Sequence, residues 1–281
     1  MPTLPYHVLD VFTDRPYAGN PLAVVLDGDD LSTESMQAIA REFNLSETTF
    51  PTSSDRADYA VRIFTPGTEL PFAGHPSIGT AWLLARLGRI PAGEVRQDCA
   101  AGVLPVAVTG SGATLTGGAP TVSDPLDAEP LLHSVGLEAG SLAGIAPPRT
   151  AGTGLEWTYL AVEADAVGRA APDWIGLARS VPSTGLAVFS WTDGVAHLRA
   201  MTTEGFEDPA TGSAALGFGV YLAASGLVRD GTTEYRIHQG AEIGRPSTLY
   251  GTVTTEGGTV SAVTVRGGVV PVATGEITPP A

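Results

Sequence analysis

Two titratable side chains open the same short pattern at two distant places in the chain. His75 begins His75–Ala81 and Asp208 begins Asp208–Ala214, and both segments read polar residue, Pro, two variable residues, Gly, Thr or Ser, and Ala. Arg62–Thr65 and Arg199–Thr202 add a match upstream, which indicates an internal duplication. An imidazole and a carboxylate at matching places of a duplicated fold predict a cleft between two halves, with acid/base groups facing each other across it.

Each segment also has the features of a helix start. Asp is a strong cap, and Pro is tolerated at the first helical position because its missing N–H would be unpaired there. The free backbone N–H groups and the dipole of such a helix end attract an anion. Gly79 and Gly212 allow a ligand to approach the backbone closely, and Thr80 and Ser213 supply hydroxyl groups. Two such starts predict a site for a small carboxylate between His75 and Asp208. For one copy alone, a plain cap or a loop histidine is the simpler interpretation.

Glu47 is a third candidate for proton transfer. It lies in a strand-like segment just after a predicted helix, among hydroxyl-bearing residues and close to Phe50. A carboxylate in apolar surroundings can have a raised pKa, which suits a general acid or base. An exposed strand glutamate is the commoner interpretation of such a residue.

Strand patterns dominate the chain and predict an α+β protein of two similar lobes, each a mixed, barrel-like sheet around one buried helix. The predicted lobes are residues 1–118, with Glu47 and His75, and residues 119–281, with Asp208; the last strand either stays in the second lobe or returns to the first. The expected strands are rich in β-branched and aromatic residues: Val8–Thr13, Pro21–Leu26, Tyr59–Phe64, Val103–Val108, Trp157–Val162, Ala187–Trp191, Val195–Ala200, Thr248–Thr254 and Thr259–Val265. The expected helices are Thr33–Asn44, Pro76–Leu87, Ala128–Val135, Pro172–Arg179 and Pro209–Ala224.

Composition excludes several classes of function. The net charge of −15 argues against binding nucleic acid or an anionic membrane surface. All 15 basic residues are arginine, which excludes Schiff-base lysine chemistry and a P-loop. Cys99 is the only cysteine, so no internal disulfide or two-thiol mechanism is possible, and the scattered histidines predict no metal site. The start of the chain has no signal-peptide pattern, and we expect a cytoplasmic protein.

Several segments together make the chain resemble the phenazine-biosynthesis PhzF-like family, which is related in fold to diaminopimelate epimerase. The matching segments run through nearly the whole chain in family order: Ala18–Val25, Asn44–Thr48, Arg62–Pro66, Glu69–Pro76, Glu207–Ala214, Gln239-Gly240 and Gly244–Ser247. Met201–Thr203 departs from the family pattern, which leaves local substrate contacts open.

The resemblance implies an isomerase that needs neither cofactor nor metal, often a homodimer, with its site between two lobes. It assigns the mobile proton to Glu47 and makes His75 and Asp208 the other polar residues of the catalytic set. Its substrate-holding positions fall on Asn20, Gly74, Gly212 and Ser213. The epimerase relatives use paired cysteines, which here are replaced by Ala73 and Pro209, so that mechanism is excluded.

The resemblance, together with Glu47, His75 and Asp208, thus implies a cofactor-independent isomerase that moves a proton within a small unsaturated amino or imino carboxylic acid. The substrate is a phenazine precursor or another diene of secondary metabolism. A catalytically inactive binding or interaction protein of the same fold is the alternative, against which the joint presence of Glu47, His75 and Asp208 counts. Hydrolysis by Asp208, His75 and water is a third possibility, without support from a serine-nucleophile motif.

Overall fold

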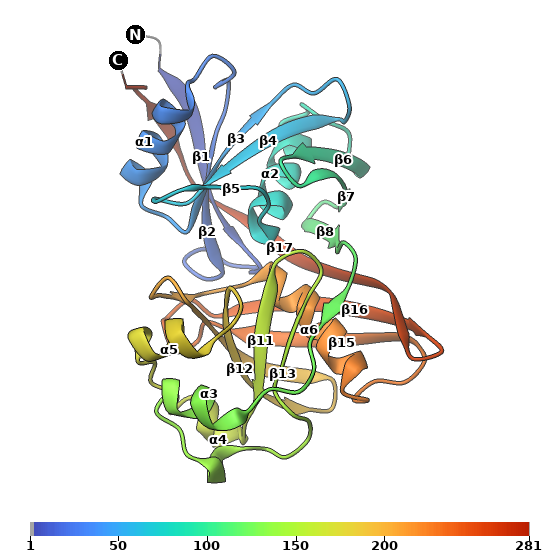
Figure 1. Ribbon diagram of the computed structural model, residues 1–281. Coiled ribbons are helices and arrows are strands. Elements are labelled where there is room, and N and C mark those ends of the chain that lie inside the picture. Colours follow the sequence, from blue (N-terminus) through green and yellow to red (C-terminus); the bar gives the residue numbers. More distant parts are fainter. Residues whose placement is uncertain (1–2, 281) are drawn as a thin grey trace. The chain divides into compact units, whose positions relative to one another are not determined.

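The computed structural model describes residues 3–280, which divide into two compact units. Unit 1 comprises residues up to Thr116 together with the segment from Arg266 onward, and unit 2 comprises Gly117–Val265. Figure 1 shows both as sheets that enclose a helix. The predicted α+β class, with two similar lobes, is confirmed.

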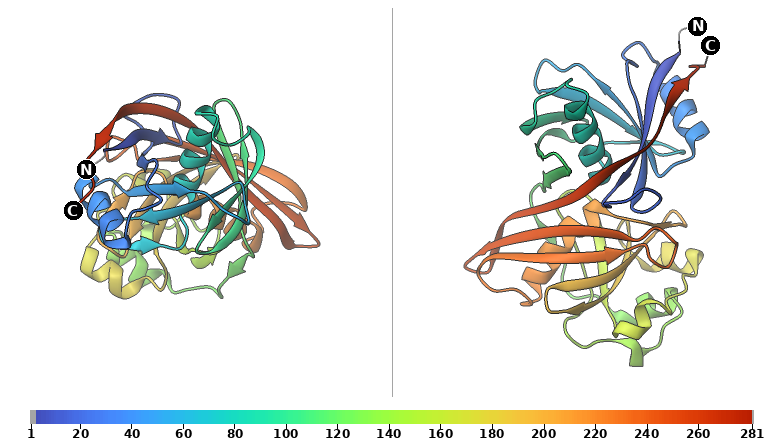
Figure 2. Two further views of the ribbon diagram at one scale, coloured as in Figure 1. Left: turned by 90° about the horizontal axis from the view of Figure 1, so that it is seen from above. Right: turned by 180° about the vertical axis from the view of Figure 1, so that it is seen from behind.

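Unit 1 is a closed barrel around a central helix. Its elements are β1 (Leu4–Val11), β2 (Asn20–Val25), α1 (Thr33–Phe43), β3 (Glu47–Thr52), β4 (Tyr59–Phe64), β5 (Glu69–Leu70), α2 (Gly74–Arg86), β6 (Gly93–Cys99), β7 (Gly102–Val108), β8 (Gly112–Thr116) and the last part of β17 (Thr259–Ile277). Pairing runs β17-β1-β2-β3-β4-β6-β7-β8 and returns to β17, which closes the ring. The first and last strands pair here, because Leu4 of β1 lies opposite Ile277 of β17, and Figure 2 shows these strands side by side.

Unit 2 has a similar order of strands around its own central helix. Its elements are β9 (Thr121–Val122), α3 (Ala128–Ser134), a 3-10 turn (Ala139–Ser141), β10 (Arg149–Gly152), β11 (Glu156–Ala161), α4 (Ala164–Val167), α5 (Trp174–Ser180), β12 (Gly185–Thr192), β13 (Val195–Thr202), β14 (Glu207–Asp208), α6 (Gly212–Ala224), β15 (Gly231–Gln239), β16 (Ser247–Glu256) and the first part of β17. Parallel pairing joins β2 to β3 and β4 to β6 in unit 1, and joins β11 to β12 and β13 to β15 in unit 2. The predicted duplication is therefore visible in the topology of the sheets.

The central helices are apolar on nearly all sides because sheet surrounds them. In α2, every residue from Gly74 to Leu84 is buried, and the helix packs on β1, β2, β3, β7 and β8. In α6 the buried residues run from Gly212 to Leu222 apart from Ser213, and the helix packs on β10, β11 and β16. A helix with no polar face is typical of one enclosed by other structure.

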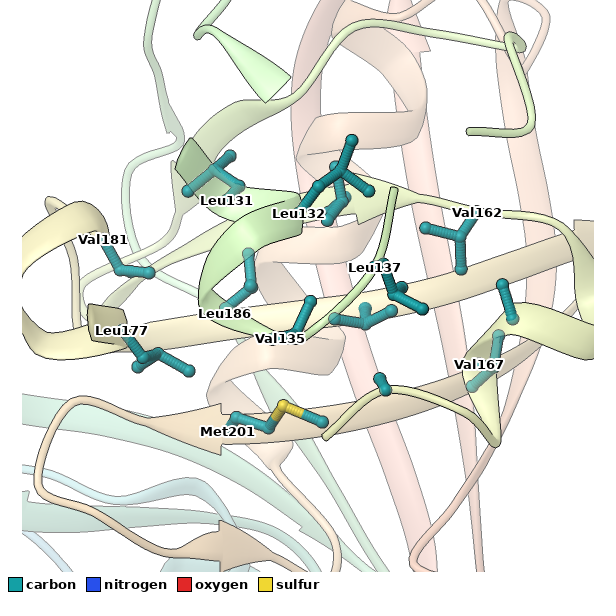
Figure 3. Close-up of a cluster of buried hydrophobic side chains, with 14 residues drawn as sticks. Leu131, Leu132, Val135, Leu137, Val162, Val167, Leu177, Val181, Leu186 and Met201 are labelled. Atoms are coloured by element: carbon teal, nitrogen blue, oxygen red, sulfur yellow. The ribbon is translucent and has the colours of Figure 1, made fainter. Parts of the chain in front are cut away.

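Side chains on the outer faces of the sheets form separate cores with the remaining helices. In unit 2, Leu131 and Leu132 of α3 and Leu177 of α5 pack with Leu186 and Met201 of the sheet, as Figure 3 shows. In unit 1, Met36, Ile39 and Ala40 of α1 form such a core with residues of the sheet. Because side chains alternate along a strand, the intervening residues point inward to α2 or α6. This alternation decides which strand residues can contact the starts of the central helices.

Candidate active site

Glu47 is the first residue of β3 and points into the barrel of unit 1. The turn before it is made by Asn44, which ends α1 in the left-handed conformation at φ 50°. Glu47 lies opposite Leu22 of the parallel strand β2, and its side chain is 14% exposed. Thr49, two residues on and therefore on the same face, has its hydroxyl 2.8 Å from that of Thr80 in α2. The predicted strand position of Glu47 holds, and the side chain is largely enclosed.

His75 is the second residue of α2 and faces Glu47. Its Nε2 lies 3.2 Å from Oε2 of Glu47, and its side chain is 5% exposed. Burial lowers the pKa of His75 to about 3, against the opposing effect of a hydrogen bond to the backbone of Pro21. The imidazole is therefore neutral at pH 7, and the contact joins a carboxyl group to an uncharged ring.

A buried chain of hydrogen bonds fixes the start of α2. The Tyr59 hydroxyl donates to Gln97 Oε1 at 2.9 Å, and Gln97 Nε2 donates to Ser77 Oγ at 2.9 Å. Ser77 Oγ donates in turn to the carbonyl of Ala73, the residue just before Gly74, at 2.8 Å. Burial holds the pKa of Tyr59 above its ordinary value, so its hydroxyl keeps its proton. This network holds the turn that presents Gly74 and His75.

Asn20, the remaining candidate of unit 1, is the first residue of β2. Its side chain is fully buried, and it lies opposite Val11 of β1. It stands two residues before Leu22, the β2 residue opposite Glu47, at the same end of the β2–β3 pair.

Asp208 of unit 2 lies in the short strand β14, opposite Ala200 of β13. Its Oδ2 accepts a 2.6 Å hydrogen bond from Thr211 Oγ1. Gln239 Nε2 donates to the Asp208 carbonyl at 2.7 Å, and Gln239 Oε1 accepts from the backbone N–H of Thr211 at 3.1 Å. The expectation that Asp208 caps the helix is wrong, because α6 begins only at Gly212, after Thr211, which makes no side-chain capping bond. The Asp208–Thr211 loop before α6 is held by the Gln239 side chain.

The motif Gln239-Gly240 with Gly244–Ser247 supports this same loop. Gly240 has φ 78°, and a Cβ there would lie 2.5 Å from the Pro209 carbonyl oxygen and 2.4 Å from that of Arg245. Ser247 Oγ contacts these two carbonyls at 3.0 and 2.8 Å. The motif therefore positions the Asp208 segment through its backbone.

Gly212 and Ser213 are the first two residues of α6. Ser213 Oγ accepts a 3.1 Å hydrogen bond from the indole Nε1 of Trp157 in β11. Trp157 itself is buried. The sequence pattern places Trp157 in a strand and does not mark it as a site residue.

The register of the internal repeat differs from the sequence-based one. Both central helices follow the order Glu, any residue, Pro, two residues, Gly: Glu69–Gly74 in unit 1 and Glu207–Gly212 in unit 2. His75 therefore corresponds to Ser213, while Asp208 corresponds to Leu70 and not to His75. In the same register Pro209 matches Pro71, so the counterpart of Ala73 is Thr211, in place of the Pro209 expected from the sequence.

One ion pair recurs in both units and supports this register. Arg62 binds Glu69 through two hydrogen bonds of 2.7 Å each, and Arg199 binds Glu207 through bonds of 2.9 and 2.7 Å. The first pair joins β4 to the short strand β5, and the second joins β13 to the short strand β14. Arg199 also donates to the carbonyls of Val167 and Ala170, so the second pair is buried where the first is half-exposed.

Gly79 and Thr80 serve packing. A Cβ on Gly79 would lie 2.6 Å from Leu22 Cδ2 and 2.9 Å from Val11 Cγ2. The glycine therefore allows the sheet to pack closely on α2. Thr80 is fully buried and its hydroxyl contacts that of Thr49. The expected approach of a ligand at Gly79 is wrong.

Residues 3–280 contain neither a grouped set of metal ligands nor a helix suited to cross a membrane. Between residues 3 and 280, no group of three His, Cys, Asp or Glu side chains is placed to hold a metal ion. Cys99 is buried with a free thiol. None of the helices in the same range combines the length and hydropathy that crossing a bilayer requires.

Comparison with known proteins places this geometry in a family. The family model of phenazine biosynthesis-like proteins (PhzC-PhzF) matches residues 9–275. An uncharacterized isomerase of Mesorhizobium japonicum is 35% identical over 99% of both chains, and a trans-2,3-dihydro-3-hydroxyanthranilate isomerase of Pseudomonas aeruginosa is 36% identical over 93% of this chain and 95% of its own. The crystal structure of a Bacillus anthracis phenazine biosynthesis protein of the PhzF family superposes with a TM-score of 0.91 at 29% identity, covering 99% of this chain and 100% of that one. The chain belongs to the phenazine biosynthesis-like PhzF family of isomerases.

Proposed function

We propose that this isomerase moves a proton between two carbon atoms of a small unsaturated amino or imino carboxylic acid, with Glu47 as the acid/base group. The observation that carries the proposal is the enclosed contact of Glu47 with a neutral His75, at 3.2 Å. A carboxyl group that can be reached by substrate but is largely shielded from water suits proton transfer to and from carbon.

The proposed reaction needs one base and no external reactant. The Glu47 carboxylate takes a proton from a carbon next to the conjugated system, and the C–H electrons move into that system. The carboxylic acid then returns the proton to a carbon at the other end, where a new C–H bond forms, so the substrate is isomerised with no net gain or loss of atoms. The neutral His75 hydrogen-bonds Glu47 or the substrate in turn and adds no charge of its own.

The remaining candidates bind the substrate in this proposal. These candidates are Asn20, Gly74, Asp208, Gly212 and Ser213, whose polar atoms suit the polar groups of such a substrate. The first turn of α6 offers backbone N–H groups and a hydroxyl, which suit a carboxylate. The name of the Pseudomonas relative, an isomerase of an unsaturated hydroxy-amino acid, supports this substrate class, either as a phenazine precursor or as another specialised metabolite.

Turnover in deuterated buffer tests the role of Glu47. With trans-2,3-dihydro-3-hydroxyanthranilate as the first substrate, we expect Glu47→Gln to lower kcat by roughly 10²- to 10⁴-fold, the usual contribution of general acid/base catalysis. Glu42→Gln removes the same charge from the exposed side of α1 and should leave kcat unchanged. Full turnover by Glu47→Gln would overturn the proposal, and solvent deuterium at the new C–H position would show that the proton passes through an exchangeable group.

A further inference from the structure

The place of Glu47 in unit 1 is taken by a glycine in unit 2. In unit 1, Thr48 of β3 lies opposite Phe64 of β4. In unit 2, Leu186 of β12 lies opposite Met201 of β13. Phe64 and Met201 occupy the same position of the repeat, two residues after the paired arginines. Thr48 therefore corresponds to Leu186, and the residue before it, Glu47, corresponds to Gly185.

Trp157 fills the space that a side chain at Gly185 would need. A Cβ there would lie 2.5 Å from Cζ3 of the Trp157 ring and 2.4 Å from the carbonyl oxygen of Met201, so no larger residue fits beside the indole. The same indole donates to Ser213, whose counterpart in unit 1 is His75. Unit 2 thus holds a tryptophan–serine contact where unit 1 holds the glutamate–histidine contact.

The chemistry of the two contacts differs in one decisive respect. Indole N–H is a donor only, so Ser213 Oγ has to accept from Trp157 with one of its lone pairs. The serine proton then points away from the indole, and among residues 3–280 no side chain or carbonyl accepts it. A hydroxyl fixed in this way offers a proton at the start of α6, where the backbone N–H groups also point outward.

We propose that Trp157 is a positioning residue that holds the Ser213 hydroxyl as a hydrogen-bond donor toward the substrate carboxylate. This assignment rests on the proposed function of Ser213 as a substrate-binding residue. In this assignment the unit 1 copy of the repeat carries the acid/base pair, and the unit 2 copy carries an anchor that neither takes nor gives up a proton.

Binding of anthranilate, a stable aromatic amino carboxylate, tests the coupling by calorimetry. We expect Trp157→Phe, which removes the N–H and keeps an aromatic ring, to weaken binding about fivefold, as the loss of one hydrogen bond does. In a Ser213→Ala background the same change should have no further effect, whereas a merely structural tryptophan would weaken binding equally in both backgrounds. Ser213→Thr keeps the hydroxyl and should restore the sensitivity to Trp157→Phe. Trp191→Phe, the same change elsewhere in unit 2, is the matched control. Wild-type protein that binds anthranilate no better than its primary amide would overturn the role assigned to the carboxylate.

A second measurement is independent of turnover and of the fold of the tryptophan variant. The indole N–H signal of Trp157 in a proton–nitrogen correlation spectrum should move when Ser213 is replaced by Ala, and the signal of Trp191 should not. An unmoved Trp157 signal would refute the hydrogen bond and with it the inference. Loss of activity in Glu47→Gln bears on the proposed reaction and leaves this spectrum unaffected, so the two proposals can fail separately.

Discussion

His75 makes the stability of the protein depend on pH in a direction that its burial determines. The imidazole has an ordinary pKa of 6.5, which burial lowers to about 3 in the folded chain. Between these values the unfolded chain binds a proton that the folded chain does not, so the contribution of His75 to stability is lost as the pH falls below 6.5. Each pH unit in this window costs about 1.4 kcal/mol, so at pH 4.5 the folded state is less stable by about 2.7 kcal/mol than at neutral pH on account of this group alone.

Urea unfolding followed by circular dichroism from pH 7.5 to pH 4.5 measures this effect. We expect His75→Gln to remove it, so that wild type loses about 2.7 kcal/mol more than the variant over that range, whatever the stability of the variant at pH 7.5. Carboxylates elsewhere cancel in the difference between the two proteins. Glu47 contacts the ring, so the comparison is repeated in a Glu47→Gln background.

The control is His133→Gln, which changes an exposed histidine at the end of α3. Its pH profile should follow that of wild type. Parallel profiles for His75→Gln and wild type would refute the reasoning, because they would mean that the His75 imidazole takes up its proton in the folded chain as readily as in the unfolded one.

Two further expectations concern stability and use matched positions. Arg199→Met leaves Glu207 buried without its partner and should lower the free energy of unfolding by about 3–5 kcal/mol, whereas Arg62→Met, at the half-exposed pair, should cost about 1 kcal/mol or less; chemical denaturation compares them, and equal losses would contradict the difference in burial. Gly79→Ala forces a methyl group into the helix–sheet contact and should cost about 1–3 kcal/mol in the same assay, while Gly140→Ala, with open space around the new Cβ, should leave the midpoint within error.

Local structure followed from local signals. The first helix was predicted over Thr33–Asn44, and α1 runs over Thr33–Phe43 with the Ser32 side chain accepting from Ser35 N at its start. The tight turn between β12 and β13 is equally local, because the adjacent residues Asp193 and Gly194 both take positive φ, 50° and 81°. Such features depend on a few adjacent residues and can be predicted from them.

The register of the repeat could not be settled in this way. Pro76 and Pro71 are each followed three residues later by glycine, so either can be matched to Pro209. The correct match to Pro209 follows from strand pairing. Arg62 of β4 binds Glu69 of β5, and Arg199 of β13 binds Glu207 of β14. That pairing forms only once the strands are in place.

The contacts at the candidate site are long-range for the same reason. Glu47 and His75 come from a strand and a helix that meet only in the folded barrel. The Trp157–Ser213 hydrogen bond could not be predicted from the sequence. The residue that indicates it is Gly185, which leaves room for the indole, and only strand pairing shows that Gly185 corresponds to Glu47.

The shared strand β17 also determines the order in which the chain can fold. The ring of unit 1 is completed by residues from Arg266 onward, which are synthesised after the whole of unit 2. Until then β1 and β8 are open edges, and exposed strand edges favour aggregation during synthesis. The pairing of Leu4 with Ile277 joins residues at nearly the greatest separation that the chain permits, so closure of the first barrel is a late and slow event. The barrel that carries Glu47 and His75 is therefore started before unit 2 and completed after it.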